Sequence, residues 1–276
     1  MAEILRRSRA MLPWRLARLA FLGLVAFWQV FLVAPIVIIV IASFTSANYM
    51  TFPPPGFSVK WFAEVMSLSW FKDALVTSLI VATASTAAAA AIGILAARVL
   101  ARHHFRGRVV VEYVVLSPLI LPGVVLGFAL FNALVYFRLE DLGLPNLIAG
   151  HTLVTVPFVV RSVWSAMAGT DISLEEAAQS LGANPAVAFW KVVLPTARPG
   201  IIAGAILAFT YSFNDLTMSI FLSGVDATTL PVQVMANIEY SADPTPAAVS
   251  TLMVGLTFTF FIIIARTVGL RVFTDR

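Results

Sequence analysis

The sequence contains no cysteine, which excludes disulfide bonds, thiolate metal sites and a cysteine nucleophile together. Its three histidines, His103, His104 and His151, are too few and too scattered to predict a metal cluster. No Gly-x-x-x-x-Gly-Lys-Ser/Thr segment occurs, so the chain does not bind ATP through a P-loop. Charged residues make up only 12% of the 276 residues, which lies outside the range of ordinary soluble domains.

The rest of the composition is apolar, with 60% hydrophobic residues and a mean hydropathy of +0.93. A soluble core cannot hide so much apolar surface, so we expect lipid to surround most of the chain. Six apolar runs are each long enough to cross roughly 30 Å of hydrocarbon as a helix. They lie near residues 20–44, 74–98, 110–137, 146–168, 200–222 and 247–267. The sequence therefore predicts an all-α membrane protein with six transmembrane helices, in which a short segment (1–19) precedes a single transmembrane domain (20–276).

Lysine and arginine in the loops predict the orientation. If the N-terminus is cytoplasmic, fourteen of these residues lie on its side of the membrane and three, Lys60, Lys72 and Arg138, on the other, with Arg161 inside the fourth run. We therefore expect both termini and the loop 169–199 to be cytoplasmic. The net charge of +4 then follows from topology and requires no nucleic-acid partner. The first run is longer than the roughly 7–15 apolar residues of a cleaved signal peptide, so we expect it to be retained.

Two of the runs contain residues that do not suit an uninterrupted helix in lipid. Pro118 and Pro122 each delete a helical hydrogen bond in the third run. Their break either lines a solute path or is a packing kink. In the fifth run Asp215 follows Ser212 and Asn214, and a carboxylate in lipid is costly unless it is paired or hydrated. Asp215 therefore either lines the path with these neighbours and meets an amine of a cationic solute, or caps a break, or pairs with a base of a neighbouring subunit.

The polar segment "SLEEAAQSLGANPAVAFWKVVLP" predicts two capped helices. Ser173 and Glu176 fit a capping box, and Gly182 is placed to end the first helix in the left-handed conformation. Asn184 and the proline after it predict the start of a second helix, which we expect to stop before Pro195. A rigid helix pair outside the membrane suits docking into a groove of another protein. A helix resting on lipid headgroups is less favoured, because "EEAAQSLGA" lacks a Lys/Arg face.

Most of this segment, "EAAQSLGANPAVAFWKVVLP", resembles the EAA loop of permease subunits of binding-protein-dependent ABC importers. That pattern is Glu-Ala-Ala, three residues, Gly, nine residues, an aliphatic residue, any residue and Leu-Pro; Val192 stands where isoleucine is usual. The resemblance implies the type I permease fold and a coupling helix that sits in a cleft of a cytoplasmic ATPase subunit. The implied coupling residues are the matching ones and the glutamate before them: Glu175, Glu176, Ala177, Ala178, Gly182, Leu194 and Pro195.

The same resemblance implies the partners and the location of the chain. They are a second homologous permease, two ABC ATPase subunits that hold ATP and magnesium, a periplasmic or lipid-anchored substrate-binding protein, and the lipid of a bacterial cytoplasmic membrane. Whether the permease pair consists of identical chains is left open. The resemblance implies no catalysis, no cofactor and no metal on this chain.

Three further stretches, "SFTSANYMTFPPPGFSVKWF", "SFNDLTMSIFLSG" and "TLPVQVM", are similar to the spermidine/putrescine branch of the family, in particular its second permease subunit. Related permeases for opines, aminoethylphosphonate or ferric iron are the alternatives. An intramembrane enzyme is less favoured because Asp215 has no catalytic histidine or cysteine beside it in the sequence. An ATP-independent secondary carrier or channel would leave the capped loop unexplained.

Overall fold

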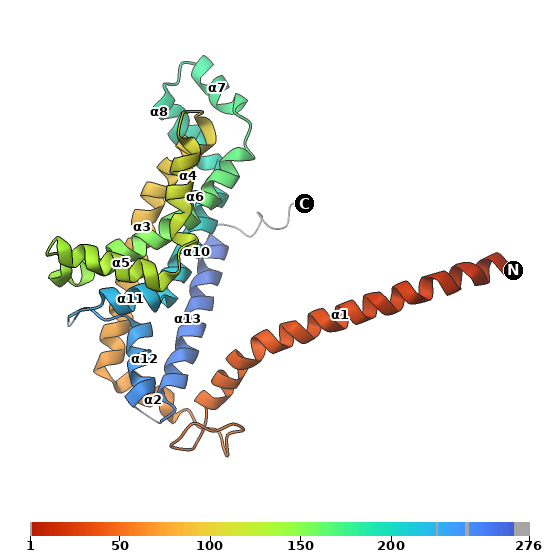
Figure 1. Ribbon diagram of the computed structural model, residues 1–276, viewed down its shortest axis with the longest axis vertical. Coiled ribbons are helices and arrows are strands. Elements are labelled where there is room, and N and C mark those ends of the chain that lie inside the picture. The colour runs from red at the N-terminus through yellow and green to blue at the C-terminus, as the bar shows by residue number, and fades with distance from the viewer. Residues whose placement is uncertain (1, 225, 241–242, 268–276) are drawn as a thin grey trace. The chain divides into compact units, whose positions relative to one another are not determined.

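The computed structural model describes residues 2–224, 226–240 and 243–267 (Figure 1). The described chain is helical, and its only β-type pairings are two isolated bridges, Thr45 with Phe57 and Gly224 with Ala227. Contacts divide it into two compact units, one formed by Met1–Val65 with Ala242–Thr251 and one by Met66–Ser241 with Leu252–Arg276. This division is one of contact density, and a single transmembrane domain from residue 20 onward stays a prediction.

The first unit contains the long helix α1 (Ala2–Ser43) and the loop that follows it. The Trp61 indole N–H donates to the Thr45 carbonyl at 3.0 Å. The Lys60 ammonium donates to the Ser46 carbonyl at 2.8 Å and to Asn48 Oδ1 at 2.7 Å. These bonds hold the loop against the start of α2 (Lys60–Ser67). The last long helix, α13 (Thr245–Thr267), has residues in both units.

The core of the second unit is formed by α3 (Ser69–Arg102), α6 (Leu144–Ala168) and α10 (Arg198–Asn214), which pack along one another. Small residues allow this, because without a Cβ neighbouring backbones approach closely in lipid. A Cβ on Gly93 would lie 2.8 Å from Cβ of Val159, and one on Gly200 would lie 2.5 Å from the Ser162 carbonyl oxygen. One face of the alanine-rich second run is therefore buried in the bundle, including Ala82, Ala89 and Ala97.

The remaining elements of this unit are shorter. The chain runs through α4 (Arg108–Leu116), η1 (Ser117–Leu119), α5 (Gly123–Tyr136) and η2 (Glu140–Leu142) before α6. After α10 come α11 (Thr217–Leu222) and α12 (Leu230–Tyr240). In Figure 1, α5 runs across the direction of α3 and α6. The loop between α6 and α10 carries the short helices α7 and α8 at one end of the unit.

Four helical segments of the described chain are long and apolar enough to cross a membrane: Ala17–Ser43, Ser69–Arg102, Leu144–Ala168 and Thr245–Ile263. The number is six if each of two bent pairs forms one span. The third predicted run is one such pair, because α4 with η1 and α5 meet at 102°. The predicted break at Pro118 and Pro122 is therefore present.

The fifth predicted run, 200–222, is not one continuous helix, and the break at Asp215 that the sequence left open is present. Helix α10 ends at Asn214, and Asp215 has an extended backbone with φ −76° and ψ 117°. Helix α11 then begins at Thr217. The second bent pair instead joins the segment Pro185–Thr196 to α10 at 69°. The region is apolar as its composition indicates, but the polar residues Asn214 and Asp215 end the helix within it.

Candidate coupling site and the membrane break

The loop 169–199 contains a first helix, α7 (Ser173–Ser180), whose start differs from the expected capping box. Ser173 is the first helical residue and makes no side-chain cap. Asp171 Oδ1 instead accepts the Ser173 backbone N–H at 2.9 Å. That bond first, then the Ser173 hydroxyl and the nearby Arg102 charge, lower the pKa of Asp171. The capping-box expectation is wrong because α7 begins one residue earlier than expected. The Glu176 N–H, which the Ser173 hydroxyl was expected to accept, donates to the Ile172 carbonyl at 3.1 Å instead.

The end of α7 agrees with the expectation for Gly182. Its φ is +94°, and its N–H donates to the Gln179 carbonyl at 2.9 Å while the Ala183 N–H donates to the Ala178 carbonyl at 3.1 Å. These two bonds form the Schellman motif, which satisfies carbonyls left open at a helix end. Nothing lies within 4 Å of a Cβ built on Gly182, so only its backbone conformation restricts the residue.

We expect Gly182→Val to lower uptake through the assembled transporter and Gly182→Asn to leave most of it. A β-branched residue with positive φ is strained by about 1–2 kcal/mol or more, whereas asparagine tolerates this conformation. The two variants add side chains to the same open space, so they separate backbone strain from bulk. Equal loss of uptake in both, measured at matched membrane levels, would contradict the conformational role.

The second half of the loop starts as expected and ends later than expected. Asn184 Oδ1 accepts the Val187 N–H at 2.8 Å and caps α8 (Pro185–Ala188). The helix then continues through a wider π-type turn, η3 (Phe189–Val193), and through α9 (Leu194–Thr196). The expected stop before Pro195 is wrong. Proline lacks an N–H and clashes with the carbonyl four residues earlier, and the widened turn before it accommodates both.

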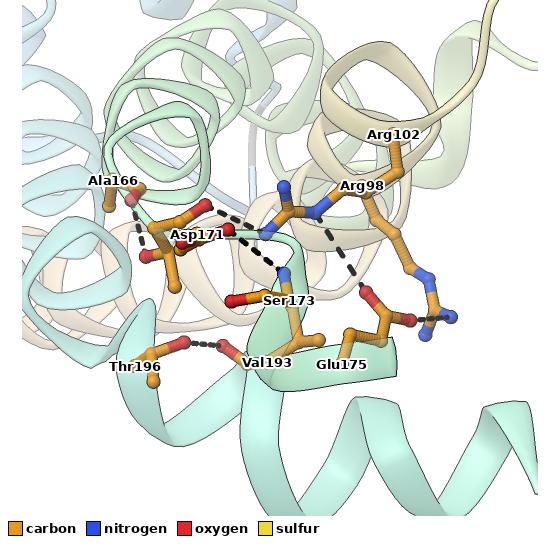
Figure 2. Close-up of polar contacts among 9 residues, drawn as sticks. Arg98, Arg102, Ala166, Asp171, Ser173, Glu175, Val193 and Thr196 are labelled. Carbon is orange, nitrogen blue, oxygen red and sulfur yellow. Dashed lines mark hydrogen bonds and ion pairs between the residues drawn. The ribbon is translucent and has the colours of Figure 1, made fainter. Parts of the chain in front are cut away.

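The two adjacent glutamates of α7 have different surroundings. Glu175 is buried, with Oε1 3.2 Å from Arg98 Nη2 and Oε2 3.8 Å from Arg102 Nε, both near the end of α3 (Figure 2). Glu176 is exposed. Successive helical residues point about 100° apart, so one carboxylate faces the bundle and the next faces outward. The sequence assigned both residues to coupling but did not separate these two positions.

The outward surface of the loop combines charge with exposed apolar side chains. Leu181 is 90% exposed and Trp190 65% exposed, and Leu174 is also exposed. Ala177 and Pro195 are exposed, whereas Ala178 and Leu194 are half-buried. Large apolar residues gathered on a capped loop are typical of a surface that another protein covers. We define the coupling surface as Leu174, Glu176, Ala177, Leu181 and Trp190.

The residues proposed for a solute path lie at two helix breaks that the fold brings together. A Cβ on Gly123, the residue after Pro122, would lie 3.1 Å from Cγ2 of Thr217, the first residue of α11. Asp215 is 9% exposed, and its Oδ2 accepts the Met218 N–H at 2.7 Å. The carboxylate therefore caps α11, which is one of the alternatives left open by the sequence.

The neighbours of Asp215 face in different directions. Ser212 is buried, with its Oγ 3.1 Å from Ser85 Oγ of α3. Asn214 is exposed and donates to the Thr210 carbonyl at 2.8 Å and to Thr257 Oγ1 at 3.3 Å. Ser212, Asn214 and Asp215 therefore do not form one cluster of side chains, although all three adjoin the break.

His151 is a residue of this region that the sequence did not indicate. It is fully buried, with Nδ1 2.8 Å from Ser212 Oγ and Nε2 3.0 Å from Ser219 Oγ. The Ser219 hydroxyl in turn donates to the Asp215 carbonyl at 2.8 Å. The imidazole thus joins α6 to both sides of the break. The polar residues inside otherwise apolar runs were the available signal, but their partners are 61 and 68 residues away in sequence.

These features define a multi-span helical membrane protein with a structured loop for a partner outside the bundle. Residues 89–274 match the family described as binding-protein-dependent transport system inner membrane component, and the chain belongs to that family. It is 34% identical over 249 residues to the putrescine transport system permease protein PotI of Escherichia coli strain K12, covering 88% of this chain and 86% of that protein. It is 31% identical over 232 residues to the spermidine/putrescine transport system permease protein PotC of that strain, covering 84% and 87%.

Solved structures show the same fold. A bacterial ABC transporter involved in the import of the acidic polysaccharide alginate aligns with a TM-score of 0.75 and 16% identity over 98% of this chain and 100% of that chain. The MetNI methionine ABC transporter aligns with a TM-score of 0.63 and 21% identity over 73% and 97%. The expected all-α permease fold and inner-membrane location are confirmed. The orientation of the termini stays a prediction.

Proposed function

We propose that this chain is a permease subunit of an ATP-driven polyamine importer, with spermidine or putrescine as the solute. The observation that carries the proposal is the coupling surface, in which the EAA-type residues lie on a capped loop with exposed Glu176, Leu181 and Trp190. The solute class is supported by the polyamine transport systems to which PotI and PotC belong, two relatives that match more than four fifths of the chain.

The assembly that we propose follows from this assignment. The loop 169–199 lies on the cytoplasmic side and docks into a groove of an ABC ATPase subunit, which binds ATP and magnesium. A second permease completes the solute path, a second ATPase copy binds to it, and a substrate-binding protein delivers the solute from the other side. The residues proposed for coupling and for the path do not catalyse a reaction, and this chain binds no cofactor.

The test is uptake of labelled spermidine and putrescine in the native host, with the chain intact, deleted and restored from a plasmid. We expect deletion to remove ATP-dependent uptake and restoration to recover it. Unchanged polyamine uptake in the deleted strain under inducing conditions would contradict the solute assignment. If the deleted strain instead loses uptake of aminoethylphosphonate, an opine or ferric iron, that compound would be assigned as the solute of this permease subunit.

We propose further that the two adjoining breaks, at Pro118 and Pro122 and at Asp215, border the solute path. Asp215→Asn keeps an oxygen that accepts the Met218 N–H but removes the charge. We expect it to raise the KM for uptake by roughly tenfold or more, because a hydrogen bond to a charged group contributes about 1.5–3 kcal/mol. Asp215→Leu removes the cap as well. Normal uptake with Asp215→Asn but loss with Asp215→Leu would leave Asp215 as a helix cap only.

A further inference from the structure

The coupling loop is held to one membrane helix at several points. Glu175 lies between Arg98 and Arg102, which are one turn apart on α3 and therefore on the same face (Figure 2). Arg102 Nη2 also donates to the Thr170 carbonyl at 3.2 Å. The Arg98 guanidinium lies 4.2 Å from the centre of the Phe189 ring, in the second half of the loop. The end of α3 thus contacts the loop before α7, within α7 and after α8.

The same helix reaches the break at Asp215. Ser85 of α3 contacts Ser212 of α10 at 3.1 Å, three residues before Asp215. Ser85 and Arg98 are 13 residues apart, which is about 20 Å along a helix. Between these two points α3 packs closely against α6, since a Cβ on Gly93 would lie 2.8 Å from Cβ of Val159. Helix α3 therefore connects the coupling loop to the break as one rigid element.

We propose that Glu175, Arg98 and Arg102 form an ionic clamp through which movement of the docked coupling loop is passed to α3. The clamp residues are positioning residues, since none of them belongs to the coupling surface. This proposal rests on the proposed function and names the contact inside the permease that transmits ATPase closure. The division of the two glutamates supports it. Glu176 faces the partner while Glu175, joined to it by one peptide bond, faces α3.

The charged groups of the clamp favour a role in transmitting movement over a role as an ordinary packing contact. Both guanidinium groups are partly buried, and Arg102 Nε has no hydrogen-bond partner other than its ion pair with Glu175 in the described chain. Neutralising one residue of a partly buried ion pair leaves the charge of the other residue uncompensated. Neutralising both residues leaves less uncompensated charge. Variants that neutralise one residue of the pair and variants that neutralise both should therefore differ in their effect on coupling. A purely apolar contact would not produce this difference.

The test uses the complete reconstituted transporter, with both permeases, the ATPase and the polyamine-loaded binding protein, in proteoliposomes. Spermidine uptake and ATP hydrolysis are measured together for Glu175→Gln, Arg98→Gln and the double variant. Arg106→Gln is the matched control, because Arg106 is exposed, carries the same charge and lies in the loop after α3. Copurification of the ATPase and thermal stability in detergent are recorded for every variant.

We expect the ratio of ATP hydrolysed to spermidine transported to rise about fivefold or more over the wild type in each single variant, which is the lower end of typical allosteric coupling factors. The ATPase is expected to copurify as before. The double variant is expected to be no worse than the poorer single variant, because both changes remove one interaction. An unchanged ratio, or multiplied effects in the double variant, would overturn the clamp. A parallel fall in uptake, hydrolysis and thermal stability would also overturn it and assign these residues to folding alone. A wild-type complex that binds no ATPase would instead reject the proposed function and the clamp with it.

Discussion

Glu176→Lys is expected to lower polyamine uptake by about tenfold or more while the chain remains at its normal level in the membrane. Glu176 is exposed on the coupling surface. We expect a basic group of the ATPase to face Glu176. A like charge placed against it costs several kcal/mol, and about 1.4 kcal/mol corresponds to a factor of ten in affinity. The folded chain is unaffected, since this side chain makes no cap in α7 and the ion pairs of the loop use Glu175.

The measurement is copurification of the ATPase together with labelled spermidine uptake. Glu176→Gln removes the charge without reversing it and is expected to have a smaller effect. Glu140→Lys is the matched control, because Glu140 is also exposed but lies in η2, far along the chain from the coupling loop. Full uptake by Glu176→Lys with ATPase still bound would remove Glu176 from the docking surface.

Gly200→Val is expected to destabilise the bundle most strongly of the changes considered. A Cβ at this position would lie 2.5 Å from the Ser162 carbonyl oxygen and 2.6 Å from the Ala166 Cβ. The obstructing atoms belong to the backbone and first carbon of α6, so no side-chain rotation relieves the clash. Overpacking typically costs about 1–3 kcal/mol and a branched side chain adds to it. We expect the apparent Tm of the purified complex to fall by roughly 5–10 °C.

The control for this change is Gly255→Ala in α13. Nothing lies within 4 Å of a Cβ built on Gly255, and its φ is not in the left-handed region. We expect its Tm to equal or slightly exceed that of the wild type, because alanine favours a helix by about 1 kcal/mol over glycine. A Tm for Gly200→Val within one degree or so of the control would contradict this prediction. It would show that α6 and α10 can move apart here without losing stability.

Features that depend on neighbouring residues could be predicted from the sequence. The length of the apolar runs located the long helices, and the hydrogen bonds that proline cannot make located the break before α5. Gly182 and Asn184 have the predicted conformations because turn and cap preferences act over a few residues. The EAA-type pattern indicated the family before any contact was known. Where a helix begins one residue earlier than its capping pattern predicts, as α7 does at Ser173, the pattern alone selects the wrong cap.

Only the tertiary structure decided which polar residues meet. Glu175 contacts Arg98 across 77 residues of chain, and Ser212 contacts Ser85 across 127. The sequence assigned both glutamates of α7 to coupling without showing that they face opposite ways, and His151 had no visible partner. The break at Asp215 likewise depends on a buried carboxylate whose oxygen caps α11 inside the bundle. Composition determined that this chain spans a membrane, and the capped loop with its EAA-type pattern predicted a docking site, because both signals follow from local chemistry. The route between docking loop and membrane break depends on which helix faces pack together, and that is a property of the folded bundle.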